Sequence, residues 1–308
     1  MSRLHEALTD YLSVRRAMGY KLERAGKLLA QFVDYLDDSD VATVTVEHAL
    51  AWSMLPTEGG INWWAHRLSV VRGFASYLSM IDPATEVPPT DLLPWHNKRA
   101  TPYLYSDDEV AALLSATKML QGALRTATYR TLLGLLTVTG LRIGEAIRLD
   151  RGDLDVRAGL LVVRSTKFGK DRQVPLHPTT TAALTGYLKL RDGLLPHPDT
   201  TAVFISPAGT RLLYCNVNWT FLKLVDLAGL VPRAGSCRPR LHDFRHSFAV
   251  NTVLDGYRTG ADVQARLPLL STYLGHIHPA NTYWYLSAAP ELLALAGRRL
   301  EDRLESGR

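Results

Sequence analysis

The chain has 308 residues, 46% hydrophobic and 21% charged, which suits two packed domains and excludes a disordered or acidic solvating protein. The formal net charge of +5 favours a polyanionic partner without requiring one. The two cysteines lack metal-ligand spacing, no signal peptide begins the chain, and no run approaches the ~20 apolar residues that span a bilayer. We therefore expect a soluble, cytoplasmic protein with no membrane partner.

Residues 1–85 are predicted to form a helical domain, because apolar residues recur there at spacings of three and four. Gly19 interrupts the first run, and Thr45 is suited to cap the third helix. The apolar spacing predicts helices around residues 4–12, 28–36, 46–52 and 64–78.

Residues 86–103 are predicted to be a linker, since prolines cluster there. A second domain, 104–289, begins with a capping box formed by Ser106 and Glu109. Helices dominate this domain, apart from a predicted β-hairpin with strands at 160–164 and 172–176 and a further short strand at 203–205. Residues 290–308 are predicted to form a helical tail.

Charge is spread unevenly between these parts. Residues 1–100 hold 10 Lys and Arg against 12 Asp and Glu, whereas residues 101–308 hold 25 against 18. This difference is compatible with phosphate contacts in the second domain and equally with ordinary variation of the surface.

Three short segments combine residues able to act on a phosphate. They are T-G-L-R-I-G-E at 139–145, H-D-F-R-H at 242–246 and L-G-H at 274–276, and Tyr285 follows nine residues after the last. Each has an ordinary explanation when taken alone. Arg142 could be a surface arginine paired with Glu145, His242 a packed or surface histidine, and Tyr285 a core residue. Their joint occurrence, in this order, favours a functional site over these separate structural roles.

With K-F-G-K-D-R-Q-V-P-L at 167–176, these segments resemble the tyrosine recombinases, or phage integrases, particularly the Xer-like and transposon-borne types. The four blocks span residues 139–285, nearly all of the second domain. The resemblance implies a mainly α fold with a small antiparallel β-sheet, in two domains: a helical core-binding domain, which binds DNA, and a mixed catalytic domain.

The resemblance also assigns roles. It implies that Arg142 and Arg245 are the catalytic arginines and that Glu145 supports the first of them. The remaining catalytic positions are Lys167, His242, His276 and the nucleophile Tyr285. Lys170 competes with Lys167, and Tyr283 and Tyr273 compete with Tyr285. Further side chains beside the site are candidates for DNA phosphate contacts or for solvated surface charge: Arg164, Lys170, Arg172 and Arg240.

These residue types suit attack on a phosphodiester. Two guanidiniums match the non-bridging oxygens of the transition state and stay charged, so no metal or other cofactor is expected. A phenol forms an ester that a DNA hydroxyl can attack in turn. Because free tyrosine has a pKa near 10, His242 is the expected base or orienting group. Lys167 would protonate the leaving oxygen.

The resemblance therefore implies a nucleoid-associated enzyme that acts on double-stranded DNA with inverted-repeat core sites. It would cleave through a 3′-phosphotyrosine and exchange strands through a Holliday junction, in DNA integration, excision or transposition. A homo-tetramer, or a hetero-tetramer with related recombinases, would assemble on DNA, with each tail docked on a neighbour or packed on its own domain. The alternatives are DNA relaxation as in type IB topoisomerases and a non-catalytic DNA-binding protein on this fold.

Overall fold

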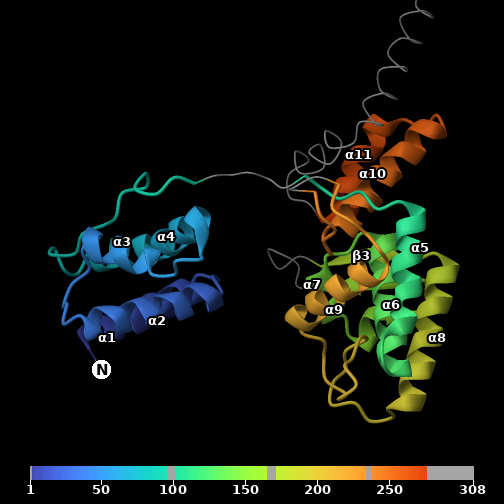
Figure 1. The fold of residues 1–308 in the computed structure, drawn as a ribbon, viewed down its shortest axis with the longest axis horizontal. Helices are drawn as coiled ribbons and strands as arrows, with labels where there is room; N and C mark the ends of the chain where they lie inside the picture. The colour runs from blue at the N-terminus through green and yellow to red at the C-terminus, as the bar shows by residue number, and fades with distance from the viewer. Residues whose placement is uncertain (1, 96–100, 165–170, 234–236, 276–308) are drawn as a thin grey trace, which may run out of the picture. The chain divides into compact units, whose positions relative to one another are not determined.

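The computed structural model describes residues 2–95, 101–164, 171–233 and 237–275. The chain forms two compact units, 1–99 and 100–308 (Figure 1). The division falls inside the segment predicted as a linker. Within the described ranges, no helix is both long and apolar enough to cross a membrane.

The first unit is a bundle of four helices around a single apolar core. Phe32 and Phe74 are fully buried, and Phe32 meets Trp52 edge to face at 5.1 Å. Thr45 accepts a hydrogen bond from the backbone of His48, as the predicted cap requires. The helices are α1 (Arg3–Ala17), α2 (Glu23–Asp38), α3 (Val46–Met54) and α4 (Gly60–Leu78).

The proline-rich segment that follows is held onto the first unit over much of its described length. The backbone of Glu86 donates to Val44, and its carboxylate accepts from the backbone of Val46. Arg72 donates to the carbonyl oxygens of Pro88 and Pro89. The expected linker 86–103 is thus anchored at its start rather than free.

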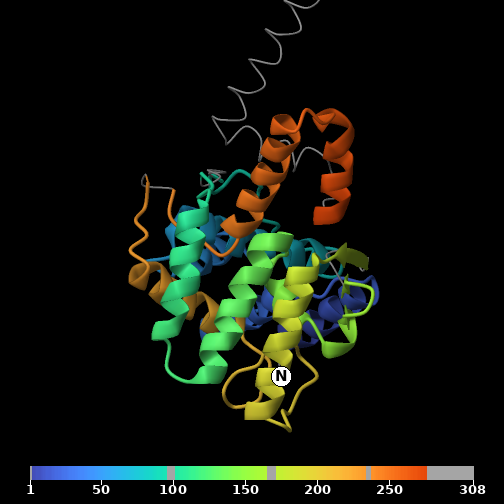
Figure 2. The same cartoon turned by 90° about the vertical axis from the view of Figure 1, so that its right-hand side faces the viewer.

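The second unit is built around helix α6, which α5, α8 and α10 contact (Figure 2). Leu132 and Leu136 of α6 are fully buried, and the predicted Ser106–Glu109 capping box starts α5. The α-helices described in this unit are α5 (Asp107–Ala116), α6 (Ala123–Thr139), α7 (Ile143–Arg148), α8 (Pro178–Leu194), α9 (Tyr214–Leu227), α10 (Asp243–Arg258) and α11 (Val263–Leu274).

A small antiparallel sheet of order β1-β2-β3 completes the second unit. The predicted hairpin forms from β2 (Leu160–Val163) and β3 (Arg172–Pro175), with Val163 opposite Arg172. Sequence periodicity did not predict β1 (Leu154–Asp155), which has only two residues. The strand predicted at 203–205 does not form, since Ala202 and Ile205 make only isolated bridges.

Four element ends meet where the site is expected. Helix α6 ends at Gly140, α7 begins after Arg142, α10 begins after His242, and α11 ends at Gly275. Helices α10 and α11 lie side by side (Figures 1 and 2). The predicted mainly α fold with a small antiparallel sheet is confirmed.

Candidate active site

Gly140 shapes the turn that presents Arg142. Its φ of +59° ends α6 in the left-handed region, which a side chain disfavours. A Cβ at this position would lie 2.6 Å from the ring of Phe248 on α10. Only glycine therefore allows both the turn and the close approach of α10. Two residues later, Arg142 adopts extended backbone as the N-cap of α7.

Glu145 holds Arg142 from one turn further along α7. Its Oε1 accepts from Nη1 of Arg142 at 2.8 Å, and its Oε2 accepts from the Arg142 backbone at 3.0 Å. The Arg142 side chain remains 32% exposed. Of its five N–H donors, the described residues engage two, through Glu145 and the carbonyl of Gly275. Arg142 thus retains donors for a bound anion.

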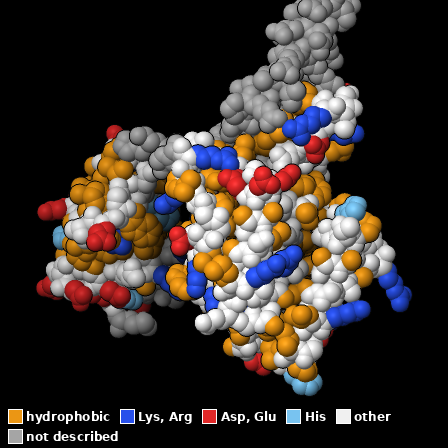
Figure 3. Space-filling view, turned by 45° about the vertical axis from the view of Figure 1, so that its right-hand side comes forward, with side chains coloured by type: hydrophobic (Ala, Val, Ile, Leu, Met, Phe, Trp, Pro, Cys, Tyr) orange, Lys and Arg blue, Asp and Glu red, His pale blue; other side chains and the backbone are white. Residues whose placement is uncertain are grey.

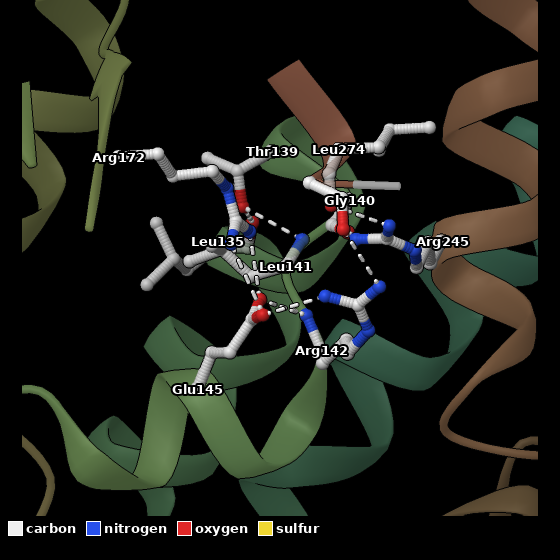
Figure 4. Close-up of polar contacts among 10 residues, drawn as sticks. Leu135, Thr139, Gly140, Leu141, Arg142, Glu145, Arg172, Arg245 and Leu274 are labelled. Atoms are coloured by element: carbon white, nitrogen blue, oxygen red, sulfur yellow. Dashed lines mark hydrogen bonds and ion pairs between the residues drawn. The ribbon is translucent and has the colours of Figure 1, made fainter. Parts of the chain in front are cut away.

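Arg172 approaches the same carboxylate from strand β3. Its Nη2 donates to Oε2 of Glu145 at 2.7 Å, and its Nη1 donates to Oε1 at 3.1 Å. Figure 4 shows the Glu145 carboxylate facing both Arg142 and Arg172. Burial by itself would raise the pKa of Glu145, but the hydrogen bonds and charges of the two arginines lower that pKa to about 2. Glu145 is therefore ionised throughout the physiological range.

Arg245 lies in the first turn of α10 and is 1% exposed. Its Nη1 donates to the carbonyl of Gly140 at 3.0 Å, and its Nη2 donates to the carbonyl of Leu274 at 2.5 Å. These carbonyls end α6 and α11, where a helix has unsatisfied acceptors and partial negative charge. A buried guanidinium is well accommodated at such ends.

The C-terminus of α11 accepts hydrogen bonds from both Arg142 and Arg245. The carbonyl of Leu274 accepts from Arg245, and the next carbonyl, that of Gly275, accepts from Nη2 of Arg142 at 3.3 Å. Gly275 has φ +68°, the left-handed value of a helix cap. Residues 103 positions apart in the chain are thus brought to consecutive carbonyl groups (Figure 4).

His242 immediately precedes α10 and reaches solvent. Loss of hydration among crowded protein atoms, followed by the positive charges of Arg245, Arg142 and Arg240, lowers the pKa of His242 to about 4. The imidazole is therefore neutral at pH 7 and has one ring nitrogen that can accept a hydrogen bond. Its ring lies edge to face with His246, at 4.8 Å between centroids.

All three candidate DNA-contact arginines among the described residues have carboxylate partners, and that of Arg172 is Glu145. Arg240 donates two hydrogen bonds, each of 2.9 Å, to the carboxylate of the fully buried Asp243. Arg164 bonds Asp153 at 2.5 Å, yet its side chain is 60% exposed. On the face shown in Figure 3, Lys and Arg are scattered rather than gathered in one patch. Phosphate contacts by these residues stay predictions.

Tyr273, one competitor for the nucleophile, is packed against the ring of Phe248 at 5.5 Å. Burial raises its pKa to about 12. A phenol that is harder to ionise and stacked on another ring is poorly suited to attack. The other predicted residues of this part of the site lie outside the described residues: Lys167, Lys170, His276, Tyr283 and Tyr285.

Two features of the site were not predicted from the sequence. Arg172 was expected at most to contact DNA, whereas it bonds Glu145. Asp243 was given no role, whereas it anchors Arg240 beside His242. The hairpin register predicts the position of Arg172 on β3. The spacing of residues in the sequence does not show that its side chain meets Glu145. Among the described residues, no cluster of His, Cys, Asp or Glu suits a metal ion.

Known proteins are similar to this chain over most of its length. A model of the phage integrase family matches residues 104–291. The chain is 43% identical over 311 residues to a Sinorhizobium fredii protein named as an integrase/recombinase, y4rB, with 99% of each chain covered. It is 29% identical over 230 residues to tyrosine recombinase XerC of Thermodesulfovibrio yellowstonii, covering 72% of this chain and 69% of the relative.

Solved structures share the fold. The crystal structure of XerA recombinase matches 96% of this chain and 98% of its own, at 22% identity and a TM-score of 0.52. The Tn1549 transposon integrase, solved with circular intermediate DNA, matches 96% of this chain and 99% of its own, at 18% identity and a TM-score of 0.63. The two-domain architecture predicted from the sequence is that of these structures.

Proposed function

The chain belongs to the phage integrase family and is a tyrosine recombinase, and from this premise we propose that it recombines DNA through a covalent 3′-phosphotyrosine at Tyr285. Membership of this family supports site-specific recombination as the activity of the chain. The covalent intermediate, the Holliday junction and the residue roles are our proposal.

The placement of Arg142 and Arg245 on consecutive carbonyls of the α11 C-terminus carries the proposal. Attack on a phosphodiester builds negative charge on the non-bridging oxygens. Two guanidiniums fixed before the substrate arrives stabilise that charge without reorganising. Their forked donors also match phosphate oxygens better than a point charge would.

The proposed reaction is a transesterification. The Tyr285 phenol oxygen attacks the scissile phosphorus, and the bond from phosphorus to the 5′ oxygen breaks. His242, neutral at pH 7, accepts or orients the phenol proton, and Lys167 gives a proton to the leaving 5′ oxygen. Attack by the 5′ hydroxyl of a partner strand reverses the step and releases Tyr285, so no external energy source is consumed.

The proposed substrate is double-stranded DNA with inverted-repeat core sites, bound by a tetramer of this chain or of related recombinases. In support, the Tn1549 transposon integrase was solved in complex with circular intermediate DNA, and XerH was solved bound to a palindromic difH substrate. In this proposal residues 1–85 form the core-binding domain, 104–289 the catalytic domain and 290–308 a tail that docks on a neighbouring subunit.

A plasmid assay tests the function. DNA sites are first selected by binding from a pool of random inverted repeats, and two copies are placed on one supercoiled plasmid. We expect excision or inversion products that require both copies. Relaxation from a single copy without recombinant product would instead indicate a topoisomerase, and binding with neither outcome would indicate a non-catalytic protein.

A further inference from the structure

Arg172 is placed to act on the arrangement of the site rather than on DNA. It is the first residue of β3, and its side chain is only 12% exposed. Both terminal nitrogens are spent on Glu145, in the two parallel bonds that a guanidinium and a carboxylate form best. The Arg172 guanidinium is thus directed at the same carboxylate that supports Arg142.

The carboxylate of Glu145 is saturated by these contacts. Oε1 accepts from Arg142 and Arg172, and Oε2 accepts from the Arg142 backbone and Arg172. Four donors fill the capacity of one carboxylate. Because the Glu145 side chain is only 2% exposed, water cannot readily replace a donor that is lost. Removing Arg172 would therefore leave half of the carboxylate's hydrogen bonds unmade.

Arg172 also packs against the end of α11. A Cβ added at Gly275 would lie 3.1 Å from Nη1 of Arg172. The carbonyl of Gly275 in turn accepts from Arg142. One side chain of the sheet thus touches both supports of Arg142, namely the carboxylate on α7 and the glycine cap of α11.

We propose that Arg172 is a positioning residue, which fixes the Arg142 guanidinium for phosphate binding by holding the Glu145 carboxylate and the Gly275 cap in place. The inference rests on the proposed function, since cleavage is what it modulates. Strand β3 would thus help to assemble the site through the ion pair between Arg172 and Glu145.

Single-turnover cleavage of a suicide substrate at saturating DNA tests the proposal. We expect Arg172→Gln to slow formation of the covalent adduct by about 10- to 100-fold, the usual consequence of misplacing a reacting group by about an ångström. DNA affinity should stay within about twofold, because many phosphate contacts share the binding. Arg172→Lys, which keeps the charge, should recover part of the rate.

A double-mutant cycle separates positioning from a general loss of structure. If Arg172 acts through Glu145, the double variant of Arg172→Gln and Glu145→Gln should cleave about as slowly as Glu145→Gln alone. Rate losses that multiply would overturn the proposal. So would an Arg172→Gln protein that binds DNA more weakly, with a shallower salt dependence, but cleaves bound DNA normally, since Arg172 would then be a phosphate contact.

Arg211→Gln is the matched control. Arg211 bonds Asp150 at 2.6 Å and the carbonyl of Ile147 at 2.9 Å, at the other end of α7. This variant also loses an ion pair and lowers stability, yet it should cleave within about twofold of wild type once folded. Wild-type protein that forms no adduct would refute the proposed function itself, whereas a normal rate for Arg172→Gln would refute this inference alone.

Discussion

At the residue scale, the net charge of the site depends on how its arginines pair with the Glu145 carboxylate. Glu145 has two arginine partners, so a positive excess remains when all three are ionised. Arg245 donates to the carbonyls at the ends of α6 and α11. The site therefore keeps positive charge ready for a phosphate, while partial negative charge from the peptide groups offsets the cost of burying it.

A lysine in place of Arg245 should separate catalysis from DNA binding. Arg245→Lys keeps the charge but cannot bond the Gly140 and Leu274 carbonyls together while reaching a phosphate. We expect cleavage to fall by about 10²–10³-fold with DNA affinity nearly unchanged. Adduct formation and filter binding of the same preparation measure the two quantities. Equal losses in both would show that Arg245 serves binding rather than chemistry.

Stability should decrease on acidification in two stages. The pKa of His242 is lowered from 6.5 to about 4, so unfolded chains bind a proton there that the folded chain does not. The free energy of unfolding should therefore fall as the pH drops from about 6.5 to 4. The pKa of Glu145 is lowered from 4.5 to about 2, so a further loss of about 3 kcal/mol is expected between those pH values.

Urea unfolding across this pH range checks the two stages separately. His242→Gln should remove the upper stage and leave the lower one, whereas Glu145→Gln should do the reverse. A wild-type stability that is flat between pH 6.5 and 3 would contradict both assignments.

At the element scale, the ends of helices rather than their middles build the site. Gly140 and Gly275 end α6 and α11 with left-handed backbone, and their carbonyls accept hydrogen bonds from Arg245 and Arg142, respectively, the two arginines proposed to be catalytic. The turn after α6 then leads directly into Arg142 and α7. A glycine at each cap is needed for the backbone to turn and for neighbouring side chains to fit.

Gly140→Ala should accordingly be costly. The added Cβ would lie 2.6 Å from Phe248 and would force alanine to a φ of +59°. We expect a loss of about 2–4 kcal/mol in stability. Gly134→Ala, within the same helix and facing open space, is the control and should stabilise by about 0.5–1 kcal/mol. Similar melting temperatures for the two variants would refute the role given to Gly140.

Local signals predicted much of this element structure. The Ser106–Glu109 capping box, the Thr45 cap and the β2–β3 hairpin form as expected, because they depend on residues close in sequence. The strand expected at 203–205 was wrong, because Ala202 and Ile205 find partners in separate segments and make only single bridges. Apolar residues alone could not distinguish a buried bridge from a strand.

The site was predictable only in part for the same reason. Arg142, Glu145, His242 and Arg245 lie in recognisable blocks, but Arg172 reaches Glu145 across 27 positions through the sheet. Sequence spacing gives no direct information about such a contact. The contact depends on the tertiary placement of β3 beside Glu145 of α7.

At the scale of the whole molecule, the segment that enters the second unit is hydrogen-bonded to α10 and to the residues just before it. Arg240 donates to the carbonyl of Thr101, and the backbone of Tyr105 donates to Ser247 on α10. The segment that leaves the first unit is anchored to that unit through Glu86. Each unit therefore fixes its own end of the connection, and the entry to the second unit lies against the segment that carries His242.

The central claim is that Tyr285 becomes joined to DNA. The direct measurement is mass spectrometry of the peptide that stays attached to a suicide substrate after digestion of the protein. We expect a DNA 3′-phosphate on Tyr285, an adduct that persists in Tyr283→Phe and disappears in Tyr285→Phe. An adduct on Tyr283, or an undiminished adduct in Tyr285→Phe, would contradict the account.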